Sequence, residues 1–462
     1  MTIPVLLTHG YFIQDDAKES QVMKPYPPLG ILYLSAFLDS KGIENVVFDT
    51  TFSSVEEQKK CILEHKPAVL GVYANLMTKK QIVGLIRWVI GEPQLTSTRI
   101  VIGGPDARYN RNHWLDIGAH FVLSGEGEVA FYSLVSAILM KAPISEVPSL
   151  SYLQGGKLID TSAAAFLPMD DLPVPARHKI NLNKYLDVWR KHHGYATISV
   201  STMRGCPYTC KWCSRAVYGQ SYRRRSPEKV VDELATLIHT YGVTSFWFVD
   251  DVFTVSHKWM KAFAEQITSR KMDIRYECIT RADRMNTEVI EYLKKSGCFR
   301  VWIGAESGSQ RVIDLMDRRV DTSKVREMIR ETKAHGMEAG TFIMLGYPGE
   351  TDEDIHETAQ HLKDSLPDYF TITTAYPIRG TELYTENTAM IDESASWSET
   401  TDREIRIKRP YPDKYYYYAI RYINNTVLAE RMRKRTKTIN PILYGKIYTS
   451  MMLMYLYRKL LW

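Results

Sequence analysis

Short apolar runs alternate with amphipathic helical patterns along the first 140 residues of this chain. Helical patterns near 30–41, 54–65, 78–90, 110–117 and 127–140 separate apolar runs at 5–8, 46–48, 68–73, 100–102 and 120–123. Such an alternation is typical of a parallel sheet that carries helices on both faces. We therefore predict a five-stranded flavodoxin-like or Rossmann-like α/β domain over residues 1–140.

The alternation resumes at residue 195 with a longer period. Helical patterns at 227–241, 257–270, 287–296, 309–335 (two helices) and 352–365 separate predicted strands at 197–201, 245–249, 275–280, 300–305, 340–345 and 369–375. Six βα units indicate a partial (β/α)6 barrel of the TIM type over residues 195–385. Its chemistry is expected at the carboxyl ends of the strands.

Two further segments complete the predicted organisation. Residues 141–194 have the pattern of a connector, because Gly155-Gly156 signals a hairpin and Pro173 and Pro175 break helices and central strands. Residues 386–462 form a basic, aromatic region that is expected to be helical. A chain of 462 residues is too long for one compact domain, which agrees with this division.

Charge and hydropathy exclude some classes of function. Residues 401–462 hold 14 basic and 4 acidic residues, whereas the rest of the chain holds 45 and 49. That balance predicts no nucleic-acid partner. No run reaches the roughly 18 apolar residues of a membrane span, and the first residues lack the basic segment of a signal peptide. We therefore expect a cytoplasmic protein with reduced cysteines.

Three of the six cysteines stand together on one predicted loop. Cys206, Cys210 and Cys213 follow the first predicted barrel strand at spacings of four and three. A [4Fe–4S] cluster takes one thiolate per iron, so three cysteines leave one iron open for chemistry. Structural zinc is the rival hypothesis, but it usually takes four ligands. The remaining cysteines are expected to be packed thiols: Cys61, Cys278 and Cys298.

The spacing Cys206-x3-Cys210-x2-Cys213 resembles the signature of the radical S-adenosylmethionine (SAM) enzymes. Its context agrees, because it follows a predicted strand and precedes a helix that Ser226-Pro227 would open. The resemblance implies that the three cysteines hold a [4Fe–4S] cluster and that SAM chelates the fourth iron. Reductive cleavage of SAM by an external electron donor then yields a 5′-deoxyadenosyl radical, which abstracts hydrogen from a small-molecule substrate.

The same resemblance implies SAM contacts at the ends of the later barrel strands. A guanidinium there suits the SAM carboxylate, and acidic and glycine positions suit its other groups. The implied contacts are Trp212, Asp250, Asp251, Arg281, Gly304, Glu306, Ser307 and Gly346. The alternative is that these acidic and glycine strand ends only cap helices or turn corners.

The first 140 residues are similar to the cobalamin-binding domain of class B radical SAM enzymes, the group that includes anaerobic cyclases and C-methyltransferases. The glycine-rich strand ends carry the likeness: Gly103, Gly104, Gly125 and Glu126 are the implied cobalamin contacts. The Asp-x-His-x-x-Gly element that supplies a histidine to cobalt in many such domains is absent. Either cobalamin is bound without that histidine, or the domain no longer binds it.

The resemblance favours a cobalamin-dependent enzyme that C-methylates an unactivated carbon. One alternative is a radical SAM oxidative cyclase or rearranging enzyme with no net methyl transfer. A remote alternative is a noncatalytic metal-binding protein associated with membranes. The cofactor motifs carry no information on the substrate.

Two basic segments have open interpretations. The loop 214–225 contains Arg215, Arg223, Arg224 and Arg225, which could meet an anionic group, clamp a cofactor or lie in solvent. The tail is aromatic, methionine-rich and basic, and a stretch such as 447–457 is too short to span a bilayer. It could pack across the barrel mouth as a helix, or contact an anionic membrane surface peripherally.

Overall fold

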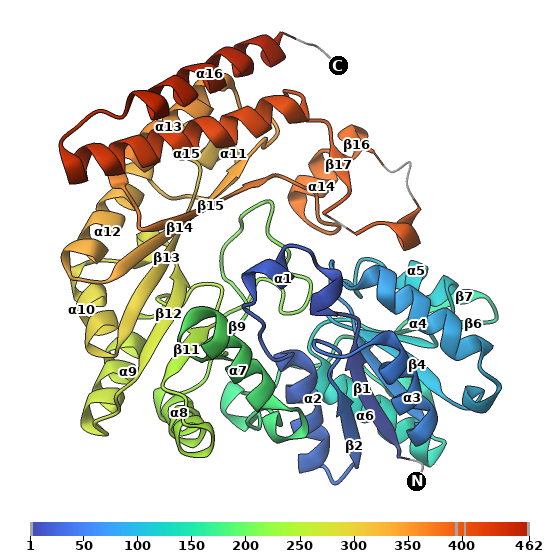
Figure 1. Cartoon of the computed structure of the whole chain (residues 1–462). Helices are drawn as coiled ribbons and strands as arrows, with labels where there is room; N and C mark the ends of the chain where they lie inside the picture. The colour runs from blue at the N-terminus through green and yellow to red at the C-terminus, as the bar shows by residue number, and fades with distance from the viewer. Residues whose placement is uncertain (1–2, 393–395, 402, 460–462) are drawn as a thin grey trace.

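This computed structural model describes residues 3–392, 396–401 and 403–459. Each half of the chain forms one large sheet built mainly of parallel strands, and the two sheets lie on opposite sides of the molecule (Figure 1). The first sheet begins with five parallel strands in the order β2-β1-β3-β4-β5. Their bounds are β1 (Val5–His9), β2 (Asn45–Phe48), β3 (Val69–Tyr73), β4 (Arg99–Gly103) and β5 (Phe121–Leu123).

The first sheet is larger than predicted. The hairpin at Gly155-Gly156 forms from β6 (Leu150–Gln154) and β7 (Lys157–Asp160), and β6 pairs antiparallel with β5, giving seven strands. Part of the predicted connector is thus an extension of this sheet. The helices of this half are α1 (Glu19–Val22), α2 (Leu29–Ser40), α3 (Val55–His65), α4 (Lys79–Gly91), α5 (Arg111–Asp116) and α6 (Gly127–Met140).

The second sheet has six parallel strands in the order β8-β11-β12-β13-β14-β15. They are β8 (Thr197–Val200), β11 (Ser245–Phe248), β12 (Arg275–Thr280), β13 (Cys298–Glu306), β14 (Glu338–Leu345) and β15 (Tyr369–Thr374). The helices are α8 (Pro227–Tyr241), α9 (His257–Ser269), α10 (Thr287–Lys295), α11 (Gln310–Leu315), α12 (Thr322–Ala334) and α13 (Asp352–Ser365). The helices cover one face (Figure 1), so the other face is free for chemistry.

A helix that was not predicted lies in the connector. α7 (Leu182–His193) begins with the Asn181 side chain accepting from the Lys184 N–H, and it buries Tyr185, Leu186 and Trp189. The Trp189 indole donates to the Pro25 carbonyl at 2.8 Å. The apolar spacing of a helix was present, but the prolines before it favoured an irregular segment.

The tail forms an antiparallel pair of helices, α15 (Asp413–Thr436) and α16 (Pro441–Arg458), which crosses the top of the molecule in Figure 1. α15 packs on α13 and buries Tyr415, Ile423 and Val427 in the core of the second half. α15 is therefore packed against the second half of the chain, with α13 and not the barrel mouth as its main support. Within the described residues, no helix is long and apolar enough to cross a membrane.

Short elements complete the chain. β9 (Met203–Arg204) and β10 (Arg223–Arg224) form an antiparallel pair that closes the base of the cysteine loop. α14 (Glu382–Glu386), β16 (Ile391–Asp392) and β17 (Arg406–Ile407) lie between β15 and the tail helices. In Figure 1 the cysteine loop, drawn in green, projects from β9 into the space between the two sheets.

Candidate functional site

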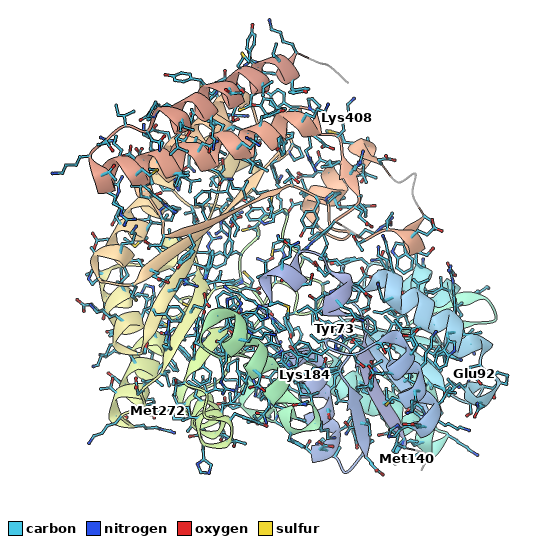
Figure 2. All side chains as sticks on the ribbon, in the orientation of Figure 1. Tyr73, Glu92, Met140, Lys184, Met272 and Lys408 are labelled. Carbon is cyan, nitrogen blue, oxygen red and sulfur yellow. The ribbon has the colours of Figure 1, made fainter. Side chains whose placement is uncertain are left out.

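A cavity of about 420 Å³ lies between the carboxyl ends of β1, β3, β4 and β5 and the cysteine loop. The strand order reverses between β1 and β3, and ligands of open α/β sheets bind at such a switch point. Tyr73, at the end of β3, lines this cavity and lies toward the middle of the molecule (Figure 2). One hollow therefore adjoins residues from both halves of the chain.

The glycines predicted to contact a cofactor line the first-sheet side of this cavity. A Cβ added at Gly103 would have no atom within 4 Å, so a side chain there would occupy cavity space. Gly104, at φ +103°, could not carry a Cβ, which would lie 2.5 Å from the Ala74 carbonyl oxygen. Gly125 has φ +91° and also lines the wall. Bare backbone beside apolar side chains fits a broad, flat ligand such as a corrin.

The three cysteines of the motif lie on the opposite wall. Cys206 and Cys213 are half-buried and line the cavity, while Cys210 is buried behind them. Gly205 starts the loop at φ +84°, and a Cβ there would lie 2.6 Å from the Ser221 carbonyl oxygen. The turn into the cysteines therefore requires glycine.

Burial controls the protonation of these thiols. It raises the pKa of Cys213 to about 12, with the carboxylate of Asp251 and the neighbouring thiols adding to the effect. Burial likewise raises the pKa of Cys206. Thiols in such surroundings become thiolates when a metal supplies compensating positive charge. Within the described residues, no three metal-binding side chains converge on a single ion; cluster cysteines need not, since each binds a different iron.

Two buried guanidinium groups contact the innermost cysteine. Arg281 Nη1 lies 3.5 Å from Cys210 Sγ, and Arg318 Nη1 lies 3.6 Å from the same sulfur. Arg281 was predicted, whereas Arg318 was not, because it stands outside the recognised motif segments. Two cationic donors therefore point at one sulfur, and this donor set fits a cluster that is held by anionic sulfur ligands.

A register shift in β13 brings Glu306 close to Arg318. The register of β13 against β14 shifts between Gly304 and Glu306, and Glu306 adopts φ +65°. Its carboxylate lies 3.5 Å from Arg318 Nη2. Burial raises the pKa of Glu306, although Arg318 and Arg281 act in the opposite direction. A Cβ at Gly304 would lie 2.3 Å from Arg318, so glycine makes room for the guanidinium.

The two aspartates after β11 differ in their partners. Asp250 is buried and accepts from the backbone N–H groups of Thr202 and Met203 at 2.7 and 3.1 Å, and from the Thr202 hydroxyl. It therefore anchors the segment that leads into the cysteine loop. Asp251 lines the cavity. Desolvation by the surrounding protein and the negative charge of Asp250 both raise the pKa of Asp251. Among the described residues, no hydrogen bond or ion pair to the Asp251 carboxylate is formed, in contrast to Asp250.

Glu126 lines the cavity, as predicted for a cofactor contact, and it also forms ion pairs within the protein. Its carboxylate pairs with Arg223 and lies 3.6 Å from Arg204, while Glu128 pairs with Arg204 at 2.5 Å. These ion pairs join the end of the first sheet to the base of the cysteine loop.

The arginines of the 214–225 loop are also engaged within the protein. Arg224 lies 3.7 Å from Asp250 and packs over the Trp259 ring at 3.4 Å. Arg225 pairs with Glu233, which Arg177 also contacts at 2.7 Å. Arg224 and Arg225 are therefore occupied within the protein, whereas Arg215 lines the cavity and donates to the Tyr208 carbonyl at 2.9 Å.

Three other predicted contacts are packed into the protein. The Ser307 hydroxyl lies 3.1 Å from that of Thr358 on α13. A Cβ at Gly346 would lie 2.8 Å from Arg409 of the tail segment. The Trp212 ring packs against a small apolar cluster, and the guanidinium carbon of Arg318 lies over this ring, 5.6 Å from its centroid.

The non-motif cysteines lie apart from the site. Cys278 and Cys298 are buried in the core of the second half, and Cys61 is half-buried on α3. The prediction that they are packed thiols is consistent with these positions.

Comparisons with known proteins agree with the geometry. The family model of the radical SAM superfamily matches residues 200–362. An uncharacterized methyltransferase of Pyrococcus horikoshii is 30% identical over 448 residues, covering 94% of this chain and 86% of the relative. The anaerobic magnesium-protoporphyrin IX monomethyl ester cyclase of Cereibacter sphaeroides is 24% identical over 383 residues, covering 79% and 61%. The solved structure of the cobalamin-dependent S-adenosylmethionine radical enzyme OxsB, with aqua-cobalamin bound, aligns with a TM-score of 0.77 at 16% identity, covering 98% and 72%.

Proposed function

The chain belongs to the radical SAM superfamily, and we propose that it is a cobalamin-dependent member that C-methylates an unactivated carbon. In this proposal, residues 1–140 bind cobalamin and residues 195–385 form the radical SAM core. The Pyrococcus horikoshii methyltransferase, which aligns over nearly the whole chain, supports methyl transfer. The substrate is a small molecule, and the electron comes from an external donor.

One observation carries the proposal: a single cavity is lined by Cys206 and Cys213 on one side and by Gly103, Gly104 and Gly125 on the other. A methyltransferase of this kind needs its radical source and its methyl carrier to reach the same carbon. Shared walls achieve that through proximity, which is a large contribution to such reactions. When bound, the cluster with SAM would supply the radical, and cobalamin would supply the methyl group.

The protein's own residues hold and shield these groups. The three cysteines would bind the cluster, with Arg281 and Arg318 stabilising the thiolate of Cys210. Asp251 and Glu306 are the acidic groups near the cysteines that could bind the SAM amino group. The apolar walls of the cavity exclude water from a reactive radical.

The inner face of the second sheet offers space for the substrate. The rings of Trp302 and Phe342 stack there at 5.0 Å and are only half-buried. The next strand in register presents Thr371 and Thr373, which are exposed. A complete barrel would fill this region with side chains. An apolar carbon skeleton with few polar groups fits such a face.

A radical SAM cyclase is the second candidate. The Cereibacter sphaeroides relative, a cyclase, aligns over 79% of this chain, and an aromatic inner face also suits a ring system. Such an enzyme would oxidise its substrate with the same cofactors and move no methyl group to the product. The two candidates therefore differ in the fate of the SAM methyl group.

The test uses the full chain, purified and reconstituted without oxygen. We expect about four iron and four sulfide per chain, bound cobalt, and 5′-deoxyadenosine after reduction with dithionite. Cys206→Ser should lose the iron and the nucleoside, whereas Cys61→Ser should keep both. A noncatalytic zinc protein would give zinc and no 5′-deoxyadenosine.

Methyl-labelled SAM then separates the two enzymatic candidates. Small molecules extracted from the source cells are incubated with the reduced enzyme, and products are followed by mass. Label that enters a new product, with one methyl gained, supports methyl transfer. A product that has lost two hydrogens and carries no label refutes it in favour of the cyclase.

A further inference from the structure

α16 has apolar residues on its outer face as well as on its inner one. Its inner face is buried against α15 through Leu443, Ser450 and Met454. On the opposite side, Ile442, Met452 and Leu456 are 69, 58 and 51% exposed. A helix that is apolar on all sides is normally covered on all sides.

The outer residues form one stripe. Positions 442, 445, 448/449, 452, 455/456 and 459 follow the three- and four-residue spacing of one helix face. Tyr448 and Tyr455 are 68 and 50% exposed and add aromatic rings to this stripe, and Ile439, just before the helix, extends it. We call this surface, residues 439–459 on the outer side of α16, the α16 outer face.

Basic side chains surround the α16 outer face. Residues 431–462 contain eight lysines and arginines and no acidic residue. Lys434 and Arg435 in the last turn of α15 and Lys437 just after it are exposed, and we call these three residues the basic turn. Within the described part of the chain, no ion pair involves them. Lys459 lies over the Tyr455 ring at 4.6 Å. Arg431, Arg433 and Arg458 instead have partners inside the protein.

We propose that the α16 outer face docks the protein peripherally on the surface of an anionic lipid bilayer. Ile442, Met452 and Leu456 would enter the boundary between headgroups and acyl chains, as apolar stripes of interfacial helices do. The basic turn would lie against the acidic headgroups. The helix is held to the protein by its inner face, so it lies along the surface and does not cross the membrane.

A second copy of the chain is a poorer occupant. In a symmetric dimer the same patch meets itself, so Lys434, Arg435 and Lys437 of both copies would be brought together, and residues 431–462 contain no acidic residue to pair with them. An anionic surface instead complements the charge. This proposal concerns the tail and stands independently of the proposed reaction.

The test is flotation of the full-length chain with vesicles. We expect the protein to float with phosphatidylcholine vesicles that contain 30% phosphatidylglycerol, and much less with pure phosphatidylcholine vesicles. Binding should decrease with added salt, because the charges act through a screened surface potential. Absence of binding to the anionic vesicles, or equal binding to both kinds, would overturn the proposal.

Charge-neutral variants test the apolar stripe. The triple variant Ile442→Gln, Met452→Gln and Leu456→Gln should lose most of its binding. The matched control changes three exposed apolar residues elsewhere: Ile90→Gln, Met140→Gln and Leu153→Gln. Figure 2 places Met140 at the edge of the molecule far from the tail. Circular dichroism and retained iron confirm that each variant is folded, and undiminished binding of the α16 variant contradicts the proposal.

A second set tests the basic turn. Lys434→Gln, Arg435→Gln and Lys437→Gln together should weaken partitioning about 100-fold, since each basic residue near an anionic surface contributes roughly a factor of five. Replacing Lys229, Lys258 and Lys261 on α8 and α9 removes the same charge from another surface and should have little effect. Equal losses in the two sets would reduce the effect to net charge and overturn the assignment to this face.

Light scattering tests whether a second copy of the chain, and not a lipid surface, covers the α16 outer face. A chain that is monomeric without lipid agrees with the proposal. A dimer that dissociates in the Ile442→Gln, Met452→Gln, Leu456→Gln variant would show that the α16 outer face is covered by a second copy, and it would refute membrane docking.

Discussion

Glu128→Gln should weaken the seam between the two halves of the chain. Glu128 begins α6, and its carboxylate accepts a charged hydrogen bond at 2.5 Å from Arg204, which is 5% exposed. Burial acts to lower the pKa of Arg204, but Glu128, Tyr218 and Glu126 outweigh it and raise that pKa. The guanidinium therefore stays charged, and its stability depends on these partners.

The magnitude follows from what remains after the substitution. Removing one partner of a buried ion pair costs about 3–5 kcal/mol, because the other charge is left without compensation. Here Glu126 stays 3.6 Å from Arg204, and glutamine can still accept a weaker neutral hydrogen bond. We therefore expect a loss of about 2–3 kcal/mol in the free energy of unfolding, and a decrease in Tm of about 2–3 °C for a chain of 462 residues.

Urea unfolding of the apo chain, followed by circular dichroism, measures this loss. The control is Asp187→Asn, which breaks the solvent-exposed Arg190–Asp187 pair and should change stability by less than about 0.5 kcal/mol. Adding Arg204→Met to Glu128→Gln removes the stranded charge and should recover most of the loss. A single variant that is as stable as the parent, or a double variant that shows no recovery, would refute the reasoning.

Three further predictions concern the site and its supports. Gly205→Ala should displace the cysteine loop and reduce the iron retained after reconstitution, whereas Gly219→Ala, whose Cβ would meet no atom, should keep its iron. Equal iron contents in the two variants would contradict the steric argument. Asp250→Ala removes three accepted hydrogen bonds and should lower the free energy of unfolding in urea by about 3 kcal/mol, whereas Asp273→Ala, at an exposed position, should change it little. A loss below about 1 kcal/mol for Asp250→Ala would show that these bonds are not needed. Burial raises the pKa of Glu350 to about 8 from 4.5, so between those pH values the folded state keeps a proton that the unfolded state loses, and stability falls as the pH rises. Glu350→Gln should remove that fall, gaining on the order of 3 kcal/mol over the parent between pH 5 and pH 8.5, and parallel pH profiles would refute the assignment.

The alternation of apolar runs was sufficient to predict the parallel strands, because central strands must be apolar and each crossover needs a helix. The runs at 68–73 and 340–345 became β3 and β14 with nearly the predicted bounds. The sheet extension by β6 was not predictable from the same signal. A hairpin pattern indicates that two strands pair with each other, and it carries no information on which edge they join.

The cysteine loop was predictable because three thiols at close spacing are a local signal. Arg318 was missed for the opposite reason: it reaches Cys210 from a loop more than a hundred residues away, and one arginine in a polar stretch has no pattern of its own. Glu126 was assigned to a ligand because acidic residues at strand ends often face one. It does line the cavity, but its ion-pair partners, Arg204 and Arg223, come from the other half of the chain and have no local signal in the sequence.

The carboxylates around the cysteines can be ranked by the donors the protein already gives them. A buried carboxylate needs hydrogen bonds or a counter-charge, so one that is fully matched inside the protein supports the fold. Asp250, with three donors, is of this kind. Glu306 has an ion pair with Arg318 at 3.5 Å, and Asp251 is exposed to the cavity. The surrounding protein raises the pKa of all three carboxyl groups, so the donors, and not the pKa shifts, separate Asp250 from the other two. A bound ammonium would add a counter-charge and lower the pKa values of Glu306 and Asp251, so these two acids are the ones that we propose as ligand contacts.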